Sequence, residues 1–181
     1  MQYRYDIQGL RAVAVLLVFF FHLNANLLSG GFVGVDVFFV ISGYLISGII
    51  LHKKEQSKFQ FVDFYISRFK RLLPAYLIFL LVTFLAATLL YLPSDIIGVR
   101  NGVFWSSIFY SNKYLSELDN YFGMSSQENP LLHTWTLAIE MQFYFLLPIM
   151  LFFIKNKKLL NYVIFLITIV LLGYSFVNST Y

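Results

Sequence analysis

Five long apolar stretches, separated by short polar segments, dominate the pattern of hydrophobic and polar residues along the chain. Each is close to the ~20 residues that an α-helix needs to cross a bilayer. The pattern therefore predicts an all-α protein, a polytopic transmembrane helix bundle. The predicted spans are 9–28, 32–51, 72–92, 134–154 and 159–177.

A sixth apolar stretch, 96–110, is shorter and carries Arg100, Asn101 and two serines. Cytoplasmic loops of membrane proteins carry an excess of lysine and arginine, so the distribution of charge helps to place this stretch. The basic segment 52–71 is predicted to be cytoplasmic, and the N-terminus with it. If 96–110 crossed the membrane, the acidic segment 112–130 would lie inside and Lys155, Lys157 and Lys158 would lie outside, against the rule. We therefore predict that 96–110 is re-entrant or interfacial.

Composition agrees with a membrane protein, because 59% of the 181 residues are hydrophobic and only 12% are charged. The net charge of +4 is small and dispersed, which argues against a nucleic-acid partner. The chain has no cysteine, and its three histidines are far apart in the sequence. No metal site is expected. The lipid bilayer is the expected environment.

The first span begins with Arg11 and carries His22 near its far end, with only apolar residues between them. Eleven residue steps along a helix place the two about 16 Å apart along the axis and about 20° apart around it, so both lie on one face. Ionisable groups inside a span are costly unless they face protein or water, which predicts an interior path along this face. Alternatively, Arg11 extends to the membrane surface and His22 only packs between helices.

Two arginines lie three residues apart in the cytoplasmic segment DFYISRFKRLLPAY, which is predicted to form a short amphipathic helix on the inner surface. The new span is expected to start at Pro74. Arg68 and Arg71 share one side of this helix, and such a pair suits phosphate groups. From these residues alone, binding to anionic lipid headgroups is the preferred interpretation, because any basic cluster next to a membrane span binds them.

Further polar residues lie in the second and fourth spans. Asp36 either stabilises the start of its helix or has a function. Glu140 lies two helical turns after His133, on the same face, and is expected to pair with an imidazole or arginine on another span. Alternatively, Glu140, Gln142 and Trp135 are structural contacts between helices.

Four segments, taken together, resemble the acyltransferase-3 family of bacterial membrane O-acyltransferases, over Tyr5 to Pro148. They are DIQGLRAVAVLLVFFFH, GFVGVDVFFVISGYLI, SRFKRLLP and LLHTWTLAIEMQFYFLLP. Two positions depart from the family pattern. Thr136 replaces the usual serine, and Met141 replaces a common second glutamate, which puts in doubt a role for an adjacent carboxylate pair.

The resemblance implies a fold of roughly ten transmembrane helices in the bacterial cytoplasmic (inner) membrane. It implies no bound cofactor, with acyl-CoA, usually acetyl-CoA, as the donor from the cytoplasm. The acceptor would be a hydroxyl of a cell-surface or lipid-linked saccharide outside. Residues 1–181 would form one C-terminally incomplete acyltransferase domain, the N-terminal half of that fold. The activity of such a fragment by itself would be in doubt.

In this reaction His22 is the predicted general base, because an imidazole titrates near neutral pH. Glu140 would orient it, although His133 is an alternative base on the acceptor side. By resemblance, Arg68 and Arg71 would hold the CoA phosphates, while Arg11 would guide the donor into the path.

The remaining candidates are Asp36, Ser42 and Trp135, which are predicted to be acceptor-side or structural residues. Transfer through an acyl group on Ser42 stays open, although no base lies beside this serine in the sequence. The competing function is a transporter or flippase that uses the intramembrane arginine, histidine and glutamate as a proton or substrate path. A purely structural membrane subunit is a third alternative.

Overall fold

The computed structural model describes residues 4–24, 26, 28–118, 126–154 and 157–179, and these form helices and connecting turns without any strand. The predicted all-α class is therefore confirmed for this part of the chain. The chain divides into two units, Met1–Tyr144 and Phe145–Tyr181. The helices are α1 (Tyr5–Leu23), α2 (Val33–Glu55), α3 (Phe61–Leu90), α4 (Pro93–Ser107), α5 (Ser111–Ser116), the 3₁₀ turn η1 (Ser126–Glu128), α6 (Thr134–Phe153) and α7 (Lys157–Ser179).

Among the described residues, four helices are long and apolar enough to cross a membrane, namely α1, α2, α3 and α6. The fifth predicted span, 159–177, lies in α7. The apolar described stretch of α7, Lys158–Tyr174, is shorter than the other four, so its crossing stays a prediction. Four apolar helices of spanning length identify a membrane protein.

Several predicted boundaries differ from the structure, and two of these differences have a local physical reason. Helix α1 ends at Leu23 rather than at Leu28, because the Asn24 side chain accepts a hydrogen bond from the Asn26 N–H at 2.9 Å, a local turn that competes with the helix. The predicted break at Pro74 is wrong, since α3 is continuous across it. A proline removes one backbone hydrogen bond, which apolar membrane helices tolerate.

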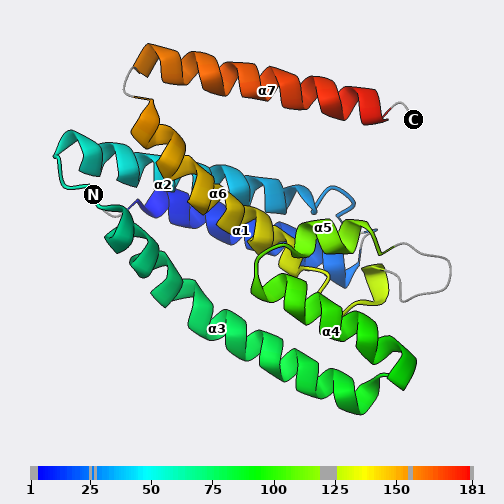
Figure 1. Ribbon diagram of the computed structural model, residues 1–181. Coiled ribbons are helices and arrows are strands. Elements are labelled where there is room, and N and C mark those ends of the chain that lie inside the picture. Colours follow the sequence, from blue (N-terminus) through cyan, green and yellow to red (C-terminus); the bar gives the residue numbers. More distant parts are fainter. Residues whose placement is uncertain (1–3, 25, 27, 119–125, 155–156, 180–181) are drawn as a thin grey trace. The chain divides into compact units, whose positions relative to one another are not determined.

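Helices α1 and α2 pack side by side in opposite directions (Figure 1). Ala14 is fully buried, and a Cβ on Gly34 would lie 2.5 Å from its carbonyl oxygen. This contact brings the two backbones together, as small residues do between membrane helices. It also fixes the register of α2 along α1.

A second set of contacts joins α3, α4 and α6 through polar groups. The Tyr76 hydroxyl donates to the Ser106 carbonyl at 3.0 Å, and the Ser106 hydroxyl lies 3.0 Å from that of Thr134. The Gln142 amide donates to the Phe109 carbonyl at 2.9 Å, which makes Gln142 a structural contact.

Helix α4 has 15 residues. Its length of about 22 Å is less than the ~30 Å of the hydrocarbon core. That 96–110 is re-entrant or interfacial stays a prediction. The acidic segment 112–130, predicted to lie outside, includes residues 119–125, which are outside the described residues.

We expect Gly34→Ala to destabilise the α1–α2 pair, because the new methyl group would overlap the Ala14 carbonyl. Overpacking of this kind costs about 1–3 kcal/mol. Gly9→Ala is the matched control, since a Cβ at Gly9 meets nothing within 4 Å. Unfolding of the chain in detergent checks both variants, and equal midpoints for Gly34→Ala and the native chain would contradict the close contact.

Candidate functional site

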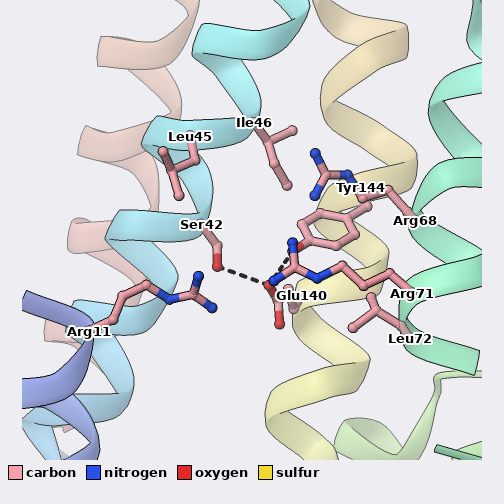
Figure 2. Close-up of a pocket in the computed structure, with 9 residues that line it drawn as sticks. All are labelled: Arg11, Ser42, Leu45, Ile46, Arg68, Arg71, Leu72, Glu140 and Tyr144. Carbon is pink, nitrogen blue, oxygen red and sulfur yellow. Dashed lines mark hydrogen bonds between the residues drawn. The ribbon is translucent and has the colours of Figure 1, made fainter. Parts of the chain in front are cut away.

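The predicted arginines converge on a small cavity of about 110 Å³ within the first unit. Figure 2 shows Arg11 entering from α1 on one side and Arg68 and Arg71 entering from α3 on the other, with Glu140 of α6 between them. We call this cavity the arginine pocket. Its lining residues are Arg11, Ser42, Leu45, Ile46, Arg68, Arg71, Leu72, Glu140 and Tyr144.

Aromatic rings, rather than carboxylates, hold two of these guanidinium groups in place. Arg11 lies 6.0 Å from the centre of the Phe38 ring, and Arg68 lies 5.5 Å from Phe64 and 5.9 Å from Tyr144. Within the described residues, none of the three arginines forms an ion pair, and the buried Arg68 Nε has no hydrogen-bond partner. Three cations with unused donors make a site for an anion.

Glu140 is hydrogen-bonded to two hydroxyl groups. Ser42, 98 residues earlier in the chain, donates to Glu140 Oε1 at 2.9 Å, and Tyr144 donates to the same oxygen from the next turn of α6. The expected pairing of Glu140 with His22 is not found among the contacts of the described residues. The two side chains line different pockets.

A second cavity, of about 380 Å³, continues from the arginine pocket and shares Arg11, Ser42 and Glu140 with it. We call it the middle pocket. Apart from these three residues and Thr136, its walls are apolar: Val15, Val18, Phe19, Val35, Phe38 and Phe39. Such walls favour the passage of an uncharged chain.

A third cavity, of about 610 Å³, shares Val18, Phe19, Val35 and Thr136 with the middle pocket. It contains the remaining predicted residues, His22, Asp36, His133 and Trp135, and we call it the histidine pocket. All nine predicted site residues therefore line one of two end pockets, and the middle pocket shares lining residues with both.

The two histidines of this pocket are in direct contact, with ring centres 4.9 Å apart. His22 Nδ1 lies 2.8 Å from the Val18 carbonyl oxygen. A carbonyl only accepts, so Nδ1 carries the proton and the neutral ring presents the lone pair of Nε2. This tautomer leaves His22 able to accept a proton at Nε2.

Helix geometry explains why Glu140 does not reach this pair. His133 precedes Glu140 by seven residues, which is about 10.5 Å along a helix axis. Tyr144, the second donor to Glu140, is not among the site residues predicted from the sequence. Its spacing of four residues, which places both side chains on one helix face, is the signal that identifies it.

Comparison with known proteins gives three results. A family model described as an acyltransferase domain matches residues 4–181. O-acetyltransferase OatA of Staphylococcus aureus (strain NCTC 8325 / PS 47) is 40% identical over 177 residues, which cover 95% of this chain and 29% of that protein. A putative O-acetyltransferase of Staphylococcus aureus (strain MSSA476) is 40% identical over 179 residues, 96% of this chain and 29% of that protein. No solved structure matches.

Partial burial lowers the pKa of His133 below its ordinary value of 6.5, and the neighbouring His22 lowers it further. The unfolded chain therefore gains this proton at a higher pH than the folded chain does. We expect the free energy of unfolding to fall as the pH drops below about 6.5, and His133→Gln to lack this part of the decrease.

Unfolding midpoints of both chains in detergent, at about pH 7.5 and about pH 5.5, check the effect. Both chains share all other titratable groups, so the difference between their pH-dependent decreases in stability reports the contribution of His133. A decrease of equal size in both would contradict the assignment to His133.

Proposed function

This chain belongs to the acyltransferase-3 family, and from that membership we propose that the whole protein is a membrane O-acyltransferase. It moves an acyl group, in the first instance acetyl, from cytoplasmic acyl-CoA to a hydroxyl of a glycan outside the membrane. The relatives named O-acetyltransferase support the acetyl group and the oxygen acceptor. The chain spans 29% of the length of those relatives, so the proposal concerns the complete protein.

One observation carries the proposal, the row of three pockets that share lining residues from Arg68 and Arg71 at one end to His22 at the other. The reaction needs such a row, because donor and acceptor are on opposite sides of a membrane. The excess of lysine and arginine in segment 52–71 supports a cytoplasmic position for the arginine pocket and for the N-terminus. The bacterial cytoplasmic membrane is part of the same proposal.

At the cytoplasmic end, Arg68 and Arg71 hold the phosphate groups of acyl-CoA. Guanidinium groups bind phosphate through paired, charge-assisted hydrogen bonds, and these two share one side of α3. Arg11 lies between the arginine pocket and the middle pocket, where it guides the donor inward. The uncharged arm and the thioester then follow the apolar walls towards His22.

At the outer end, His22 Nε2 removes the proton of the acceptor hydroxyl as its oxygen attacks the thioester carbonyl carbon. The carbon–sulfur bond breaks, CoA leaves as the thiolate, and His22 becomes an imidazolium. Asp36 lines the same pocket and stabilises this charge. The saccharide acceptor lies against Trp135 and His133, in the cavity with the largest volume of the three.

Replacement of His22 by alanine is expected to lower kcat about 10²–10⁴-fold, the usual contribution of a general base. The Arg68→Ala, Arg71→Ala pair is expected to raise KM for acetyl-CoA at least about tenfold, because charged hydrogen bonds to phosphate are lost. Transfer of labelled acetyl from acetyl-CoA to envelope glycan, in membranes that contain the product of the complete reading frame, measures both effects.

His52→Ala and Lys70→Ala are the matched controls. His52 is bonded to Gln56, and neither His52 nor Lys70 lines any of the three pockets. Both controls should label glycan at the native rate. Equal labelling by the native protein and His22→Ala, or none by a folded and abundant native protein, would reject the acyltransferase and favour the transporter or flippase.

A further inference from the structure

We infer that Glu140, together with Ser42 and Tyr144, binds the pantetheine arm of the acyl donor close to its phosphate end. This inference rests on the proposed function, because it takes acyl-CoA as the donor. It gives Glu140 a positioning role in donor recognition, in place of the predicted role beside His22.

Position is the first argument. Glu140 and Ser42 line both the arginine pocket and the middle pocket, so they lie where the two cavities meet. A donor with its phosphates on Arg68 and Arg71 and its thioester near His22 has to pass this junction. The part of the donor that lies there is the part next to the phosphates, the pantoyl hydroxyl and the first amide.

Hydrogen-bonding capacity is the second argument. Glu140 Oε1 accepts from Ser42 and Tyr144, whereas Oε2 has no partner among the contacts of the described residues. An ionised carboxylate accepts about four hydrogen bonds, so Oε2 can accept from the N–H or O–H groups of the arm. The apolar walls beyond the junction suit the methyl and methylene groups of the same arm.

The structure also argues against an acyl group on Ser42, even though Glu140 supplies the base that the sequence lacked. Gly34 packs against Ala14 and Val18. Ser42 lies eight residues beyond Gly34, about 12 Å along α2, and His22 lies one turn beyond Val18 in the opposite direction. An ester on Ser42 is therefore far from the base that serves the acceptor. Ser42 is better placed to hold the donor than to carry its acyl group.

Donors of different length separate this role from the others. Acetyl-CoA has the phosphates and the whole arm, S-acetylpantetheine has the arm alone, and S-acetyl-N-acetylcysteamine has only the last amide and the thioester. For Glu140→Gln we expect kcat/KM to fall by the same factor, about 10–100-fold, with the first two donors, mainly through KM. With the shortest donor the change should be less than about twofold, because that donor does not reach Glu140.

Ser42→Ala is expected to show the same dependence on donor length with a smaller loss, about threefold to tenfold, since a neutral hydroxyl is removed. Ser47→Ala is its matched control. Ser47 lies on the same helix and donates to the Gly43 carbonyl at 2.7 Å, outside the three pockets. It should match the native protein with every donor.

Pantetheine as an inhibitor of transfer from acetyl-CoA gives a second measurement, which does not need turnover of a truncated donor. Its inhibition constant should rise in Glu140→Gln by the factor seen with S-acetylpantetheine. N-acetylcysteamine should inhibit the variant and the native protein equally.

Two results would overturn the inference while leaving the proposed function intact. An equal loss with all three donors would assign Glu140 to the chemistry or to folding. A loss confined to acetyl-CoA would mean that Glu140 acts only through the arginines that hold the phosphates. Failure of the native protein to use acetyl-CoA at all would instead reject the proposed function.

Discussion

Three guanidinium groups inside a bundle of apolar helices impose the constraint on which the rest of the site depends. Arg11 lies in a predicted span, where a cation is costly unless it faces protein or water, so α1 has to direct it towards the interior. Arg68 and Arg71, from the basic segment that leads into the third span, line the same cavity. Phe38, Phe64 and Tyr144 lie against two of these cations without neutralising them. The charges are thus held within the protein and remain available to an anion.

The same constraint explains how Glu140 is bound. A carboxylate close to arginines would be expected to form an ion pair, but Oε1 accepts from the hydroxyl groups of Ser42 and Tyr144. Hydroxyl donors stabilise the carboxylate without using the guanidinium groups. Hydrogen-bond donors of the arginines and one acceptor oxygen of Glu140 therefore lie close together without hydrogen-bond partners among the described residues. This arrangement suits a ligand that carries both phosphates and amides.

The second feature of the site is the distance, along the helix axes, between its arginines and its histidines. Arg11 and His22 share a face of α1 but are about 16 Å apart, and the middle pocket between them is mostly apolar. Under the proposed function, charge recognition and proton transfer would therefore take place at different depths. A transferase that works across a membrane needs this division, because its two substrates approach from opposite sides.

The sequence by itself determined the all-α class, the four helices α1, α2, α3 and α6 that are long and apolar enough to cross a membrane, and which polar residues share a helix face. These properties follow from the repeat of the helix, which relates residues a few positions apart, as in Arg68 and Arg71. It did not determine that α3 continues through Pro74. Proline by itself favours the end of a helix, but the helix on both sides of Pro74 continues without a break.

Only the tertiary structure decided which distant side chains meet. The close contact of Gly34 with Ala14 sets the register of α2 along α1. The packing of α2 and α6 then brings Ser42, rather than His22, to Glu140, 98 residues away. Contacts of this kind depend on how helices are aligned in space, and helical periodicity within a segment carries no information about that alignment.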